Sequence, residues 1–134
     1  MHNANTVKIK CRSETTAMKQ YEAKKIKNIV LCGHGGCGKT SVAESMIFLS
    51  GAAERLGRIN DGNTVMDFDP EEIKRKVSVM SAVAPIEWKG YKINLIDTPG
   101  LFDFVGGVCE GMRAADTALI VVSGKDGVGV GTDK

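Results

Sequence analysis

A glycine-rich stretch at residues 33–40, which reads GHGGCGKT, has the residue types and spacing that bind phosphate. Gly33 and Gly38 let the backbone wrap closely around phosphate oxygens and point several N–H groups at them. The Lys39 ammonium would reach the β- and γ-phosphates of a nucleotide, and the Thr40 hydroxyl would bind Mg²⁺. The pattern alone also fits an accidental glycine-rich turn. Because an apolar run precedes it and an amphipathic segment follows it, the interpretation as a phosphate-binding P-loop is favoured.

A second candidate residue, Asp97, ends an apolar run that reads YKINLI. A lone aspartate at a strand end is more often a turn residue or a helix cap. With a P-loop upstream and Thr98-Pro99-Gly100 directly after it, Asp97 is instead expected to hold Mg²⁺ through a water molecule. The N–H of Gly100 is expected to contact a γ-phosphate, and the loop after it can move when this phosphate leaves.

The periodicity of the chain predicts the elements that position these residues. Short apolar or alternating runs indicate strands, and stripes of apolar residues indicate helices. The expected strands are 29–32, 77–88, 91–96 and 117–122, the expected helices are 39–50 and 108–115, and a long polar connection spans 52–76. Lys89-Gly90 would turn the second strand into the third as a hairpin. The predicted fold class is α/β, of the P-loop NTPase type, with three layers and a mostly parallel sheet.

The composition is that of a soluble globular domain, with 134 residues of which 43% are hydrophobic and 25% are charged. Residues 1–27 hold seven Lys or Arg and two Glu, a charge of +5, so the remainder of this +2 chain carries −3. Residues 1–24 lack sustained periodicity and are predicted to form a flexible basic arm. Such an arm either contacts RNA or is a solvated tail, and the second interpretation is favoured.

The cysteine pattern argues against a metal or disulfide framework, because Cys11, Cys32, Cys37 and Cys109 form no CxxC pair. Free thiols are typical of a reducing compartment. The sequence also has no apolar run of transmembrane length and no signal peptide pattern. We therefore expect a cytoplasmic protein.

Three segments together resemble the translational GTPases, and specifically elongation factor G and its paralogues. They read KNIVLCGHGGCGKTSVAESMIFLSGA, RINDGNTVMDFDPEEIKRKVSV and WKGYKINLIDTPGLFDFVGGV, within a resemblance that runs from about Lys24 to the end. The resemblance implies that residues 25–134 are part of a GTPase domain, with about four of its six strands in the order 2-3-1-4-5-6 and with strand 117–122 at an open edge. It implies GTP or GDP and Mg²⁺ as ligands, ribosomal RNA and proteins as partners, and a role in translocation. The resemblance does not lead us to expect binding to DNA or to membranes. We expect the protein to be a monomer.

The resemblance also implies roles for residues at matching positions. Residues 57–80 match the first switch, in which Ser78 stands for the usual Mg²⁺-binding threonine, and residues 97–100 begin the second switch. Ser41 would contact the α-phosphate region. The implied metal site is Thr40, Ser78 and Asp97. The implied nucleotide-binding residues are Gly33, His34, Gly35, Gly36, Cys37, Gly38, Lys39, Thr40, Ser41, Asp97 and Gly100.

Three positions depart from the family pattern. Gly36 stands where an aspartate is usual, which weakens any case for a bound monovalent cation. Lys76 replaces the glycine of a stretch usually written Arg-Gly-Ile-Thr-Ile. Leu101 replaces the histidine that positions the attacking water, and a hydrocarbon side chain cannot hydrogen-bond. No catalytic residue is therefore assigned, and nucleotide binding with slow hydrolysis is predicted.

Other functions stay open at this point. A ribosomal protection protein of the tetracycline-resistance type would share the resemblance, and Leu101 would suit a non-enzymatic nucleotide-binding module. A truncated, non-catalytic fragment is a third possibility, because the guanine-reading Asn-Lys-x-Asp motif lies beyond Lys134 and the residues present do not distinguish GTP from ATP. The charged run at 71–76 either faces ribosomal RNA or forms a solvated helix with i,i+4 ion pairs.

Overall fold

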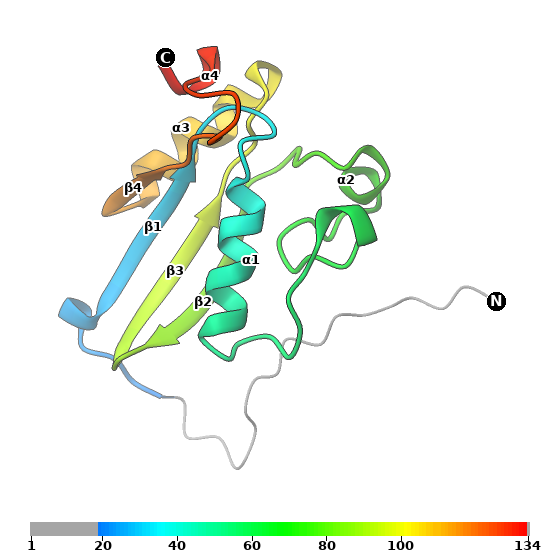
Figure 1. Cartoon of the computed structure of the whole chain (residues 1–134). Helices are drawn as coiled ribbons and strands as arrows, with labels where there is room; N and C mark the ends of the chain where they lie inside the picture. The colour runs from blue at the N-terminus through cyan, green and yellow to red at the C-terminus, as the bar shows by residue number, and fades with distance from the viewer. Residues whose placement is uncertain (1–18, 134) are drawn as a thin grey trace.

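A computed structural model describes residues 19–133 of the chain (Figure 1). Most of the arm predicted at residues 1–24 therefore lies outside the described residues. The strands are β1 (Ile26–Cys32), β2 (Ala82–Trp88), β3 (Tyr91–Asp97) and β4 (Thr117–Ile120), and the helices are α1 (Lys39–Leu49), α2 (Pro70–Arg75), α3 (Val105–Ala114) and α4 (Val130–Asp133). Short 3₁₀ turns lie at Ala23–Lys25, Ile59–Asp61 and Phe102–Phe104. Within the described part, no helix is long and apolar enough to cross a membrane.

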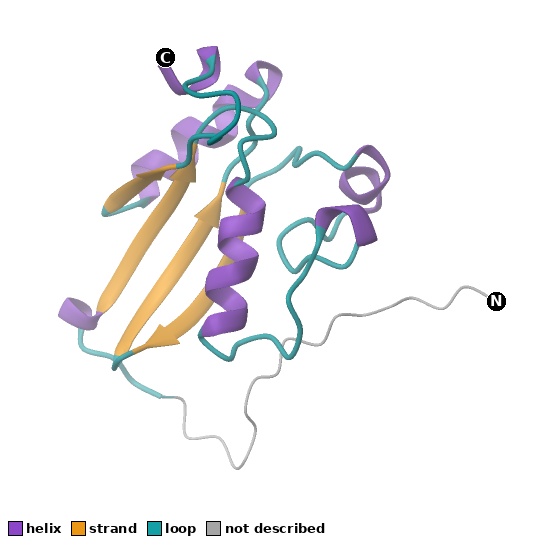
Figure 2. Ribbon diagram, viewed as in Figure 1, coloured by secondary structure: helices purple, strands orange, loops and turns teal. Residues whose placement is uncertain are grey.

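The four strands form one sheet in the order β2-β3-β1-β4 (Figure 2). β1 pairs in parallel with both β3 and β4, whereas β2 and β3 form the antiparallel hairpin that the Lys89-Gly90 turn predicted. In this register Leu31 lies beside Asp97, so the ends of β1 and β3 meet at one edge. The mostly parallel sheet is confirmed, and its first four strands follow the predicted order.

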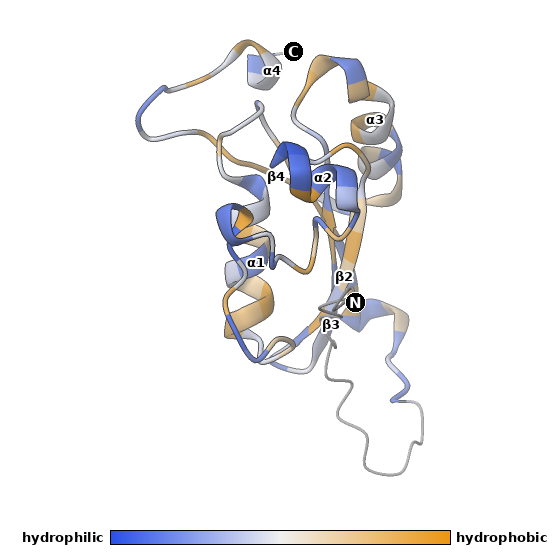
Figure 3. Ribbon diagram, turned by 90° about the vertical axis from the view of Figure 1, so that its right-hand side faces the viewer, coloured by the Kyte–Doolittle hydropathy of each residue, from blue (hydrophilic) through white to orange (hydrophobic). Residues whose placement is uncertain are grey.

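Helices cover the sheet on both faces, with α1 on one side and α3 on the other (Figure 3). The main core lies between α1 and the sheet, because the apolar side chains of both turn inward there. Its buried members are Leu31, Ala43, Ile47, Met66, Ala84, Ile86 and Leu95. A Cβ at Gly111 of α3 would lie 3.1 Å from Val30 Cγ2, so glycine lets α3 approach β1 closely. The predicted three-layer α/β fold is therefore confirmed.

The predicted element boundaries needed correction, most of all in the strand expected at 77–88, which begins only at Ala82. The N–H groups of Val79 and Met80 both donate to Glu72 Oε1, at 2.9 and 3.0 Å, and are not available to a sheet. The polar connection at 52–76 contains a short helix, α2, whose N-terminus is capped by Asp69. β4 ends two residues early, at Ile120, and α3 begins three residues early, at Val105.

β4, which pairs in parallel with β1, is an edge strand of the sheet as predicted. It pairs with β1 in the described structure, and all four of its residues are exposed. Leu119 and Ile120 are thus apolar side chains on the surface of this edge.

Candidate functional site

The glycine-rich loop connects the end of β1 to the start of α1, as its sequence context predicted. Gly38 is the N-cap of α1 and has a φ of 100°, a left-handed backbone conformation that side chains with a Cβ disfavour. At Gly33 a Cβ would clash with the carbonyl oxygen of Val121, the residue after β4. The loop therefore packs closely against the segment that follows β4. The first N–H groups of α1, which have no partner within the helix, point into the space enclosed by the loop.

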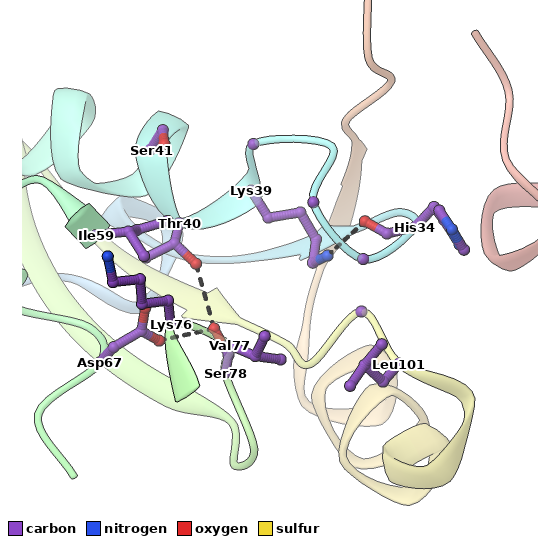
Figure 4. Close-up of a pocket in the computed structure, with 14 residues that line it drawn as sticks. His34, Lys39, Thr40, Ser41, Ile59, Asp67, Lys76, Val77, Ser78 and Leu101 are labelled. Atoms are coloured by element: carbon purple, nitrogen blue, oxygen red, sulfur yellow. Dashed lines mark hydrogen bonds between the residues drawn. The ribbon is translucent and has the colours of Figure 1, made fainter. Parts of the chain in front are cut away.

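Lys39 begins α1 and folds its side chain back over this loop. Its Nζ donates to the carbonyl oxygens of Gly33 and His34, at 3.0 and 3.1 Å, and the residue is 6% exposed (Figure 4). Gly100 comes close from the other side, because a Cβ there would lie 2.7 Å from Gly35 Cα and would clash with Lys39 Nζ. The segment after β3 thus lies directly against the lysine that was predicted to bind phosphate.

The three predicted metal ligands come together from three separate segments. Thr40 Oγ1 donates to Asp97 Oδ2 at 2.6 Å, and Ser78 Oγ lies 3.3 Å from the same threonine oxygen. Thr40 comes from α1 and Asp97 ends β3. Ser78 lies before β2, within residues 57–80, which were predicted to be the first switch and are called the first-switch segment below. Hydroxyl and carboxylate oxygens are the ligands that Mg²⁺ prefers, so the donor set fits this ion.

The buried carboxylate of Asp97 is only partly satisfied by its neighbours in this arrangement. It is 2% exposed, and its second oxygen, Oδ1, is buried without a hydrogen-bond partner among the described residues. Burial raises the pKa of Asp97 to about 6, and the negative charge of Asp67 adds to the rise, against the hydrogen bond from Thr40. A cation or its bound water would satisfy the unpaired oxygen and favour the ionised carboxylate.

Asp67 is a site residue that the sequence reasoning missed. Its Oδ1 accepts a 2.7 Å hydrogen bond from Ser78 Oγ, and the residue is 5% exposed. Burial raises the pKa of Asp67, and the charge of Glu72 acts in the same direction. Asp67 ends the run DGNTVMD inside one of the segments that carry the family resemblance, but no strand lies beside it and no ligand role was inferred from this run.

These segments enclose one cavity of about 270 Å³. The P-loop and the start of α1 form one wall, the first-switch segment forms a second, and the residues after β3 form a third. The predicted residues that line the cavity are His34, Gly35, Gly36, Gly38, Lys39, Thr40, Ser41, Ser78 and Gly100. Ile59, Asp67, Lys76, Val77 and Leu101 line it as well, whereas the predicted residues Gly33, Cys37 and Asp97 are not among its lining residues.

The side chain of Leu101 lies against the P-loop at this cavity. Its Cδ2 is 3.2 Å from the position that a Cβ at Gly35 would take, and Leu101 is 41% exposed. Where the family resemblance leads one to expect a hydrogen-bonding imidazole, the cavity wall is hydrocarbon (Figure 4). His34, which also lines the cavity, packs its ring against Gly129, and its backbone N–H donates a 3.1 Å hydrogen bond to Thr132 Oγ1.

Residues 24–134 match the family model of the elongation factor Tu GTP-binding domain. The chain belongs to this family. The family match begins at residue 24, in agreement with the prediction that the resemblance starts near Lys24.

Relatives of this GTP-binding domain are much longer proteins. The chain is 45% identical over 103 residues to the elongation factor G-like protein of Mycobacterium tuberculosis, an alignment that covers 77% of the chain and 14% of the relative. It is 38% identical over 122 residues to the mitochondrial ribosome-releasing factor 2 of Yarrowia lipolytica, covering 88% of the chain and 15% of the relative. The chain thus spans about a seventh of the relatives that it matches.

Solved structures share the fold of this GTP-binding domain. A crystal structure of a Thermus thermophilus protein matches with a TM-score of 0.79 and 41% identity, over 81% of the chain and 16% of that protein. A selenocysteine-specific elongation factor from bacteria matches with a TM-score of 0.64 and 23% identity, over 81% of the chain and 16% of that protein. At 23% identity, the match to the selenocysteine-specific factor shows a shared fold alone.

Two buried carboxylates hold the first-switch segment of the GTP-binding domain in place. Glu44 of α1 is 1% exposed, and its Oε1 accepts hydrogen bonds from the N–H groups of Val65 and Met66, at 2.6 and 3.0 Å. Glu72 of α2 is 4% exposed and holds the segment after Lys76 through the two bonds described above. The predicted solvated helix at 71–76 is therefore only partly solvated, although Arg75 and Glu71 form the expected i,i+4 ion pair.

Proposed function

We propose that this chain binds GTP or GDP together with Mg²⁺ in the cavity between the P-loop and the two switch segments. The observation that carries the proposal is the convergence of Lys39, Thr40 and Ser78 on one cavity. Asp97 joins them from a third segment, through the hydrogen bond that it accepts from Thr40. Membership in a GTP-binding family supports guanine as the base.

Each of these side chains has a part in binding. The Lys39 ammonium, now bonded to two loop carbonyls, would transfer to phosphate oxygens, and the N–H groups at the start of α1 would add neutral donors. Thr40 and Ser78 would offer hydroxyl oxygens to Mg²⁺, and Asp97 would hold a water of its shell. Mg²⁺ would neutralise charge on the β- and γ-phosphates.

Hydrolysis would require a water that attacks the γ-phosphorus while the bond to the bridging oxygen of the β-phosphate breaks, which yields GDP and phosphate. We propose that this step is slow here, because Leu101 offers the water no hydrogen bond and His34 is packed against the segment before α4. Positioning by a general base or a comparable polar group typically contributes about 10²–10⁴-fold in rate.

For the whole protein we propose an elongation-factor-G-like role on the ribosome, with ribosomal RNA and proteins as partners. The names of the relatives support two versions of this role, ribosomal translocation and ribosome release. They favour either version over the ribosomal protection type that the sequence left open. A cytoplasmic monomer that binds neither DNA nor membranes remains part of the proposal, and the mitochondrial relatives make an organelle the alternative location.

Titration of the chain with fluorescent GDP, a non-hydrolysable GTP analogue and the matching ATP analogue tests the proposal. We expect Mg²⁺-dependent binding of the guanine nucleotides and little binding after Lys39→Ala. If the parent chain binds neither guanine nucleotide with Mg²⁺ present, the proposed function is wrong for this chain. Equal binding of the ATP analogue would remove the claim of guanine specificity alone.

A further inference from the structure

Lys76 ends α2 in a backbone conformation that lysine seldom adopts. Its φ is 56° and its ψ is 36°, which is the left-handed region, and its N–H donates to the carbonyl oxygen of Glu72. A residue with a Cβ is about 1–2 kcal/mol less stable there than in the right-handed region, whereas glycine has no such penalty. Glycine would therefore stabilise this turn more than lysine does. The presence of lysine here must have another explanation, which we look for in its side chain.

The position of this side chain offers one. Lys76 lines the same cavity as Lys39, although the two residues come from different walls. Figure 4 shows Lys76 on the first-switch wall, next to Ile59 and Asp67, with Thr40 and Ser78 between it and Lys39 in this view. Lys76 has no ion pair or hydrogen bond of its side chain to another residue within 19–133, so its ammonium is available to a ligand in the cavity.

The charge of the cavity calls for a further cation. Its described wall presents one other ammonium, from Lys39, and the carboxylate of Asp67, with Asp97 buried directly behind it. A nucleoside di- or triphosphate brings more negative charge than one lysine and one Mg²⁺ neutralise beside these two acids. A second lysine at the opposite wall would lower the resulting repulsion and would bind the phosphates from the side that the P-loop does not reach.

We propose that Lys76 is a second phosphate-binding cation, which contacts the phosphates of the bound nucleotide from the first-switch wall. The inference rests on the proposed nucleotide site and adds a residue that determines its affinity. It also gives the first switch a direct charge contact with the ligand, in addition to the metal contact expected of Ser78.

Lys89 provides a matched control inside the same chain. It is an exposed lysine with a φ of 48°, in the turn between β2 and β3, and it does not line the cavity. Lys76→Gly and Lys89→Gly both remove one positive charge and both relieve a left-handed conformation. Lys76→Met keeps the strained backbone and the length of the side chain but removes the charge.

The four proteins are titrated with fluorescent GDP and with a fluorescent non-hydrolysable GTP analogue in Mg²⁺, at two salt concentrations, and their thermal unfolding is recorded. We expect both Lys76 variants to bind about tenfold more weakly than the parent, the loss of one hydrogen bond to a charged group. Lys89→Gly should bind as the parent does. The affinity of the parent should fall more steeply with salt than that of Lys76→Met.

Both glycine variants should unfold at a higher temperature than the parent, so a weaker affinity of Lys76→Gly would not come from unfolding. A loss for both nucleotides supports contact with the α- or β-phosphate, and a loss for the GTP analogue alone supports contact with the γ-phosphate. Parent-like affinity of both Lys76 variants would overturn the inference and leave the proposed function intact. Weaker binding by Lys76→Gly but not by Lys76→Met would also overturn it, because backbone freedom would then be the cause. If the parent binds no nucleotide, the proposed function and this inference fall together.

Discussion

Replacing Glu44 with alanine should release the first-switch segment from α1. The Glu44 Oε1 atom accepts the N–H groups of Val65 and Met66, and Met66 is 1% exposed, so solvent does not readily replace the lost acceptor. Each buried donor left without a partner costs about 1–3 kcal/mol. With two donors affected, Glu44→Ala should lower the free energy of unfolding by about 2–6 kcal/mol, or should open this segment locally at a similar cost.

Glu44→Gln is the matched control, because its amide oxygen can still accept both N–H groups. The pKa of Glu44 is raised, chiefly by burial and against the two backbone hydrogen bonds. A raised carboxylate pKa means that the folded state holds its proton more tightly than the unfolded chain does. This contribution to stability is complete below the ordinary glutamate pKa of about 4.3 and is lost as the pH rises through the raised value. The glutamine variant should lack this decline, and its stability relative to the parent should improve over that interval.

The assay combines denaturant unfolding from about pH 4 to pH 8 with hydrogen exchange of the Val65 and Met66 amides. We expect faster exchange of these two amides in Glu44→Ala than in Glu44→Gln, by about 30-fold or more for 2 kcal/mol. Parent-like exchange and stability in the alanine variant would refute the reasoning, because the buried carboxylate would then not hold the segment. An unchanged pH dependence in the glutamine variant would refute the burial argument for its pKa.

Three further predictions concern the nucleotide site. Leu101→His should leave nucleotide affinity near that of the parent and raise single-turnover hydrolysis by about 10²–10⁴-fold; an unchanged rate would mean that water positioning does not limit the reaction. Gly100→Ala should weaken binding about tenfold or more, since its Cβ would clash with Lys39, whereas Gly106→Ala, which has open space around it, should bind normally. Bound nucleotide should slow the alkylation of Cys37, measured by mass spectrometry, and equal labelling with and without nucleotide would place the ligand elsewhere.

The sequence alone predicted much of the architecture, because strong local patterns carried it. The apolar runs before Gly33 and Asp97 indicated parallel strands, and parallel strands bring their ends together at one edge. The glycine spacing then placed Lys39 and Thr40 at the start of a helix. These residues meet in the structure as the motifs required, although their roles in binding stay predictions.

The parts that the sequence did not predict depend on contacts between distant segments. Val77 and Val79 alternate as a strand would, but Glu72 captures the N–H groups that a strand would need. Asp67 enters the site through the hydrogen bond that it accepts from Ser78, a contact between residues 11 positions apart that no local spacing indicated. Lys76 stood out as a departure from the family pattern, but only its φ and its place on the cavity wall gave the departure a physical meaning.

The close approach of α3 to the sheet has a consequence for how the second switch can move. α3 contains three glycines among its ten residues, and in an isolated helix each is about 1 kcal/mol less favourable than alanine. Such a helix keeps its shape only while it is docked, and at Gly111 it docks against Thr98, the residue after the proposed metal-holding Asp97. Displacing Thr98 from its hydrogen bond to the Leu31 carbonyl would remove one of the contacts that support α3, beside those of Gly111 with Val30 and Ile96. The order of α3 would thus respond to a shift of Thr98, so that a small movement beside the phosphates would change local rigidity on the opposite face of the sheet.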